Sequence, residues 1–258
     1  MKGPNSAKVR NRDASEWFTR LCLIFFFVSA SFLFGSAVAS GFCNEYARYE
    51  NQSCKNHPTI KGAVIVASAS PQEGVEDPEN KDFDLDIAVI DAGTRKTIAH
   101  GAFKAKITNG GGPRFSRITL DTGDYVVSPG LRAFGVRASL HMNLMGSEEL
   151  NLFLVRGDSI VSVLSGMTAG ASFSNGASDC RLQTREVKRT LSMDRRMTEG
   201  FYDILVLERV NDTNQHKNQT GECESVEGST ARQRYRLKFD GKEYRIPGDM
   251  LELDCRVC

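Results

Sequence analysis

Short runs in which apolar and polar residues alternate recur along most of the chain, and no long stretch has helical periodicity. Gly, Asp, Asn and Pro separate these runs, as is typical of turns between strands. The pattern predicts strands over residues 62–68, 83–90, 97–107, 117–127, 132–142, 150–155, 159–164, 186–193, 202–209, 233–239 and 242–246. We therefore predict an all-β fold: an antiparallel β-sandwich or sandwich-like sheet stack with disulfides and long surface loops.

The N-terminus resembles an export signal. A net-basic segment leads into the apolar run 21–28, and Ala37-Val38-Ala39 is a small-residue cleavage site. This arrangement predicts a signal peptide over residues 1–39 and a single β-rich domain over residues 40–258. The alternative is a retained anchor, because residues 21–39 approach the roughly 20 residues that span a bilayer.

The composition of the mature chain limits its partners. Without the five basic and two acidic residues of the signal, 28 basic and 30 acidic residues remain, a net charge of −2. Such a balance gives no long-range attraction to nucleic acid. We expect an exported protein, periplasmic or secreted, with no cofactor, no nucleic-acid partner and membrane contact only through an uncleaved signal. Its ligand or partner stays unidentified.

Six cysteines remain after the signal: Cys43, Cys54, Cys180, Cys223, Cys255 and Cys258. An even number in an exported chain predicts disulfides, although six cysteines allow 15 pairings. We favour a bond between Cys43 and Cys54, within a cysteine-bounded segment 40–60, and one between Cys180 and Cys223. The closing Cys-Arg-Val-Cys has redox-motif spacing but no helix follows it, so a structural bridge is the favoured interpretation.

The C-terminal part combines a polar segment with a hairpin. Residues 211–230 are predicted to form a long polar loop, and Asp240-Gly241 indicates a two-residue type I′ turn that places Phe239 opposite Lys242. One side of this hairpin is apolar and predicted to face the core. The other side carries arginines that could bind phosphate or carboxylate groups, or could be a solvated sheet face. These candidate ligand-binding residues are Arg232, Arg234, Arg236 and Arg245.

Asp121 is the candidate for catalysis. The segment 118–123, Ile-Thr-Leu-Asp-Thr-Gly, resembles the aspartic-protease signature, in which two aspartates share a proton. No second Asp-Thr-Gly or Asp-Ser-Gly occurs, so this hydrolase hypothesis requires a dimer. The four histidines are scattered and predict no metal site. Because no catalytic set assembles, we expect no enzyme activity.

The tripeptide Arg156-Gly157-Asp158 is the sequence that integrins recognise in host-matrix proteins. Gly157-Asp158 also fits a two-residue type II′ turn, whose first position favours glycine. That turn makes Arg156 and Ser159 the flanking pair and places Leu150, Leu152, Leu154, Val161 and Val163 on one apolar face. Adhesion is thus an alternative function that depends on the Arg156 side chain.

Four segments together resemble a group of uncharacterised exported bacterial β-rich proteins. They are SRITLDTGDYVVSPGLRAFGVRASLHM from Ser116 to Met142, LNLFLVRGDSIVSVLSG, GFYDILVLERV and YRLKFDGKEYRIP. The resemblance implies a periplasmic or secreted β-rich domain, and it transfers no catalytic residue. Our leading hypothesis is an exported, non-enzymatic β-sandwich protein that binds a ligand or partner at the cell envelope.

Overall fold

The computed structural model describes residues 41–44, 46, 49–73, 82–108, 114–176 and 180–251. The predicted signal peptide, Cys255 and Cys258 lie outside these residues. The described elements are β1 (Gln52–Asn56), β2 (Ala63–Pro71), β3 (Phe83–Asp91), β4 (Thr97–Ile107), β5 (Arg114–Ser128), β6 (Leu131–Met142), β7 (Met145–Arg156), β8 (Ser159–Asn175), β9 (Gln183–Thr198), β10 (Phe201–Lys217), β11 (Cys223–Leu237) and α2 (Gly248–Leu251).

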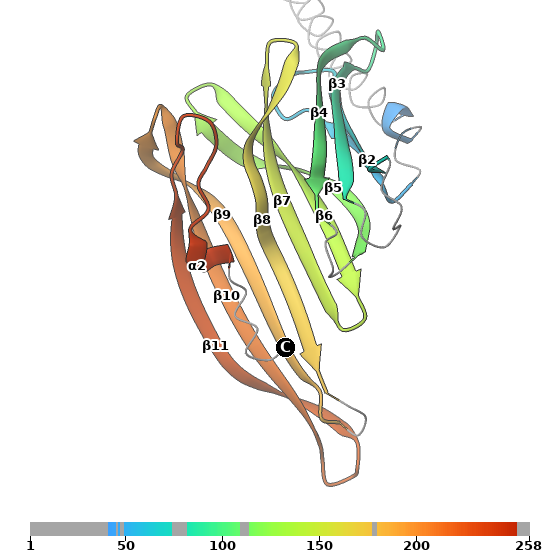
Figure 1. The fold of residues 1–258 in the computed structure, drawn as a ribbon, viewed down its shortest axis with the longest axis vertical. Coiled ribbons are helices and arrows are strands. Elements are labelled where there is room, and N and C mark those ends of the chain that lie inside the picture. The colour runs from blue at the N-terminus through green and yellow to red at the C-terminus, as the bar shows by residue number, and fades with distance from the viewer. Residues whose placement is uncertain are drawn as a thin grey trace, which may run out of the picture.

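The strands belong to one large mixed sheet (Figure 1). One path runs β1-β2-β3-β4-β8-β7-β6-β5, and β9, β10 and β11 continue from β8. Neighbours pair antiparallel, except that β4 meets β8 in parallel at His100 and Ser159. The all-β prediction is confirmed. The β-sandwich is not, because backbone pairing links all described strands into a single sheet.

The two ends of the eight-strand path meet. The Ile118 amide of β5 donates a hydrogen bond to the Glu50 carbonyl at 3.0 Å, beside the start of β1. The Leu120 amide donates to Ser53 Oγ of β1, also at 3.0 Å. The sheet therefore curls so that apolar side chains of β2, β3 and β4 pack with those of β5, β6 and β7 in one core.

A second core lies among the later strands. Apolar residues of β5 to β8 pack there with residues of β10, β11 and the C-terminal segment. The predicted apolar face of the β7–β8 hairpin belongs to this core: Leu150, Leu152, Leu154 and Val163 are buried, and Val161 is partly buried. The alternating pattern predicted that these leucines and valines face the core, and this prediction is confirmed.

Two disulfides are confirmed, Cys43 with Cys54 and Cys180 with Cys223. They are consistent with an exported protein, because disulfides persist in oxidising compartments. Within the described part of the chain, no helix is long and apolar enough to cross a membrane.

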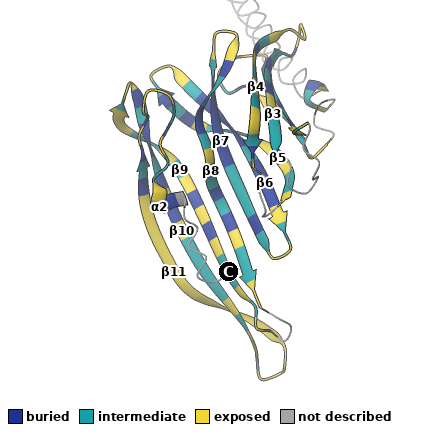
Figure 2. Ribbon diagram, in the orientation of Figure 1, coloured by how far each residue is buried: buried dark blue, intermediate teal, exposed yellow. Residues whose placement is uncertain are grey.

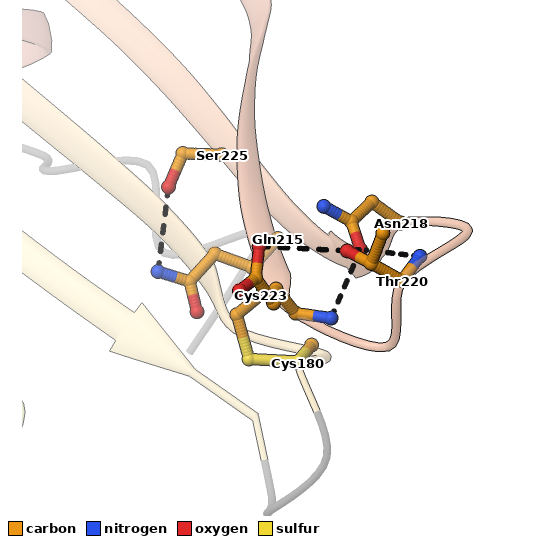
Figure 3. Close-up of a disulfide and its surroundings, with 7 residues drawn as sticks. Cys180, Gln215, Asn218, Thr220, Cys223 and Ser225 are labelled. Atoms are coloured by element: carbon orange, nitrogen blue, oxygen red, sulfur yellow. Dashed lines mark hydrogen bonds between the residues drawn. A yellow bond between two sulfur atoms is a disulfide. The ribbon is translucent and has the colours of Figure 1, made fainter.

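The segment 211–230, expected as a polar loop, is mostly strand. β10 and β11 remain paired from Asn211 with Thr230 out to Lys217 with Cys223, and only the tip 218–222 turns. At the tip, Asn218 Oδ1 accepts hydrogen bonds from the backbone amides of Thr220 and Glu222 (Figure 3). Polarity misled the prediction because this part of β11 is exposed at the edge of the sheet, as Figure 2 shows, and an exposed edge strand needs no apolar face.

The predicted type I′ turn at Asp240-Gly241 is also wrong. Phe239 pairs with Tyr244 instead of Lys242, because residues 240–243 form a longer turn. The Asp240 carboxylate accepts hydrogen bonds from the amides of Lys242 and Glu243 at 2.9 and 2.8 Å. The predicted core side is nevertheless right: Tyr235, Leu237, Phe239 and Tyr244 are buried, and Ile246 packs against the core.

Candidate functional site

A groove of about 570 Å³ lies along strands β5 to β9. Its size falls within the range of small-molecule sites. Both apolar and polar side chains line it, with one arginine each on β5, β6 and β9. The lining residues are Arg117, Tyr125, Arg137, Ser139, His141, Gly146, Ser147, Glu148, Ala169, Gly170, Ala171, Ser172, Glu186, Val187, Lys188, Arg189, Thr190 and Leu191.

Arg137 is the organising residue of the groove wall. Its Nε donates a hydrogen bond to Asp121 Oδ2 at 2.7 Å, and its Nη1 donates a hydrogen bond to Glu148 Oε1 at 2.5 Å. Tyr125 donates its hydroxyl to the same Asp121 oxygen at 2.7 Å. The two carboxylates hold the guanidinium in one orientation and raise the pKa of Arg137, although burial opposes them.

An irregularity in β5 brings these groups together. Asp121 pairs with Gly135 but Tyr125 pairs with Ala133, so β5 has additional residues at 122–124. Because of this bulge, the Tyr125 hydroxyl and the Gly123 amide both point toward the Asp121 carboxylate. The Gly123 amide donates a hydrogen bond to Asp121 Oδ1 at 2.9 Å. Opposite the bulge, a Cβ at Gly135 would lie 2.8 Å from Leu150 Cδ1 and 3.1 Å from Asp121 Cβ, so a larger residue would have to displace one of these side chains.

The surroundings of Asp121 differ from those of an aspartic-protease dyad. Burial raises the pKa of Asp121, but hydrogen bonds from Tyr125, Arg137 and Gly123 outweigh burial and keep the pKa below its ordinary value. Burial and Asp121 raise the pKa of Tyr125 to about 12. A dyad needs two carboxylates that share a proton. In the described residues, Asp121 shares no hydrogen bond with Glu148: the Arg137 guanidinium instead forms an ion pair with each of the two carboxylates.

Among the other charged residues that line the groove are Arg117, Lys188 and Glu186. In the part of the chain that the structure describes, none of these three groove residues forms an ion pair. Arg189, in contrast, is buried and paired with Glu208. Two of these three groups are cations, Arg117 on β5 and Lys188 on β9, and one is a carboxylate, Glu186 on β9.

The four arginines predicted as an anion site are not equivalent. Arg236 is neutralised by Asp194 and Asp203. Arg245 is paired with Asp240. Both arginines therefore have carboxylate partners within the molecule, supplied by β9, β10 and the turn, which local sequence could not assign to them. Arg232 and Arg234 remain exposed and without an ion pair among the described residues.

The predicted type II′ turn between β7 and β8 is confirmed. Arg156 pairs with Ser159, and Gly157 has a φ of +65°. The guanidinium of Arg156 lies 5.8 Å from the centre of the Phe201 ring, and the Asp158 carbonyl accepts a hydrogen bond from the His100 amide. Both outer residues of the Arg-Gly-Asp tripeptide therefore have contacts within the molecule.

A second polar cluster connects β4 with β8. Lys106 Nζ donates hydrogen bonds to Ser165 Oγ at 2.6 Å and to Ser162 Oγ at 3.1 Å. Ser165 donates its own proton toward Glu243 Oε2 at 3.3 Å. Burial lowers the pKa of Lys106 and raises that of Glu149. These contacts hold β4 against β8, and β8 against the turn that carries Glu243.

Comparisons with known proteins do not identify the chain: no family model, curated protein or solved structure matches it. The groove residues thus have to be judged on their geometry. Sequence reasoning found Asp121 but missed Arg117, Arg137, Glu148 and Lys188. Their arrangement depends on which strands pair, and the sequence does not show this pairing. The one available signal was that Arg117, Arg137 and Ser139 alternate with apolar residues, which places each of them on the face opposite its apolar neighbours.

Proposed function

We propose that the protein is exported, non-enzymatic and periplasmic or secreted, and that it binds a polar, anionic ligand in the groove of β5 to β9. The observation that carries this proposal is the pair of unpartnered cations, Arg117 and Lys188, in one groove with the fixed Arg137 network. Arginine and lysine bind phosphate and carboxylate groups through charge-assisted hydrogen bonds. Serine and threonine hydroxyls of the groove supply further donors for a polar ligand.

Titration calorimetry of the full-length protein with inorganic pyrophosphate tests the binding site. We expect Arg117→Gln and Lys188→Gln each to weaken binding about tenfold or more, because each removes a charge-assisted contact. Arg195→Gln is the matched control, since Arg195 is exposed and lies outside the groove. The proposal fails if pyrophosphate does not bind, or if all three variants bind it equally well.

Export is tested separately by recovering the protein from the periplasm and the medium and sequencing its N-terminus. The predicted cleavage after Ala39 gives a chain that starts at Ser40. Recovery only from the cytoplasm, with the N-terminal segment intact, would refute the exported location.

A further inference from the structure

Three cations lie directly opposite one another across the last three strands. Lys188 of β9 pairs with Arg209 of β10. Arg209 pairs in turn with Arg232 of β11. Residues that are directly opposite in a sheet project from the same face, so the three side chains form a cross-strand row. Arg234, two residues along β11, lies on the same face and extends the row.

The row is not neutralised within the molecule. In the ranges that the structure describes, none of its four residues takes part in an ion pair, and all four are exposed. The next cation on that face of β11, Arg236, is held by Asp194 and Asp203. The molecule thus supplies carboxylates to one arginine of β11 and leaves the adjacent row without any.

Like charges directly opposite in a sheet destabilise it, so the row needs an explanation. Charges on an edge strand prevent pairing with other chains, which could account for Arg232 and Arg234 on β11. That explanation does not cover Lys188 and Arg209, because β9 and β10 are paired on both sides over these residues. An external anion that bridges the row would remove the repulsion.

The row continues from the groove, because Lys188 belongs to both. Adjacent strands are about 4.8 Å apart, so the row from β9 to β11 spans roughly 10 Å before Arg234 is included. This length exceeds the reach of one phosphate group. It suits several anionic groups that follow one another along a chain.

We infer that the groove and the row together bind a linear polyanion with repeated phosphate or sulfate groups, which crosses β9, β10 and β11. This inference rests on the proposed anion site of the groove and names its ligand class. The groove holds one end of the chain near Arg117 and Lys188. Arg209, Arg232 and Arg234 bind the following groups.

The test compares pyrophosphate with long-chain inorganic polyphosphate and with dextran sulfate, each titrated into full-length protein at several salt concentrations. We expect at least one long chain to bind about tenfold or more tightly than pyrophosphate, with an affinity that falls steeply with salt as counterions are released. The polymer that binds more tightly shows whether the site prefers phosphate or sulfate groups. The double variant Arg209→Gln/Arg232→Gln should weaken binding of that polymer about tenfold and reduce the salt slope by about 2.

Pyrophosphate separates this inference from the proposed function, since the double variant should bind it within about twofold of the unchanged protein. The matched control is Arg195→Gln/Lys242→Gln, which removes the same charge at exposed sites outside the row. The inference is overturned if the control loses as much affinity as the row variant, or if neither polymer binds more tightly than pyrophosphate. Binding only to anionic lipid vesicles would also overturn it. If pyrophosphate itself does not bind, the proposed function fails as well.

Discussion

The guanidinium of Arg189 donates a hydrogen bond from Nε to the Glu208 carboxylate at 2.8 Å, and only 3% of the Arg189 side chain is exposed. Arg189 also donates to the carbonyls of Thr168 and Met250, at 3.0 and 2.8 Å. Through Met250, this buried pair attaches α2 to the sheet beside β9 and β10 (Figure 1). The pair therefore connects β8, β9, β10 and the C-terminal segment.

Glu208→Ala should destabilise the protein by about 3–5 kcal/mol, because it leaves the Arg189 charge buried without a partner. The double variant Arg189→Met/Glu208→Met should lose less, since it leaves no buried charge. Urea unfolding of both variants measures the difference. If the double variant is less stable than Glu208→Ala, the penalty does not come from the unpaired charge.

Whether a feature of the fold could be predicted from the sequence depends on whether residues close together in the chain determine it. The turn at Gly157-Asp158 was predictable because four consecutive residues determine it. The turn after Phe239 was predicted wrongly because the Asp240 carboxylate accepts hydrogen bonds from the amides of Lys242 and Glu243, and these bonds stabilise a longer turn. The opposition of Lys188 and Arg209 depends on the register of two strands, which alternation alone does not set.

The disulfide between Cys180 and Cys223 should stabilise the fold more than that between Cys43 and Cys54. The bonded residues are 43 apart in the first case and 11 in the second. The chain-entropy model then gives about 4 and about 3 kcal/mol, because the longer loop loses more freedom in the unfolded state. Paired Cys→Ala variants, compared by urea unfolding, measure this order. A larger loss from the Cys43 pair would show that native contacts outweigh loop closure.

Gly135→Ala should destabilise the groove wall by about 1–3 kcal/mol through overpacking. The added methyl group would lie 2.8 Å from Leu150 Cδ1 and 3.1 Å from Asp121 Cβ. Gly41→Ala is the control, because a Cβ at Gly41 contacts nothing within 4 Å. Urea unfolding measures stability. Pyrophosphate titration shows whether a displaced Asp121 also disturbs Arg137 and so weakens binding in the groove. Equal stability of the two variants would contradict the close packing at Gly135.

His57 should make the protein less stable in mild acid. Its Nδ1 accepts hydrogen bonds from the amides of Thr59 and Ile60, and its buried Nε2 has no partner in the described structure. Burial, and then the charge of Arg132, lower the pKa of His57 from 6.5. The folded state therefore takes up its proton less readily than the unfolded state. Stability is complete above the unfolded pKa and falls as the pH decreases through it.

Urea midpoints measured from about pH 7.5 to about pH 5.5 test this linkage. His57→Asn is the informative variant, because an amide oxygen can replace Nδ1 as acceptor but does not titrate in this range. We expect the loss of stability toward acid to be smaller in His57→Asn than in the unchanged protein. Parallel pH profiles of the two proteins would show that groups other than His57 cause the loss.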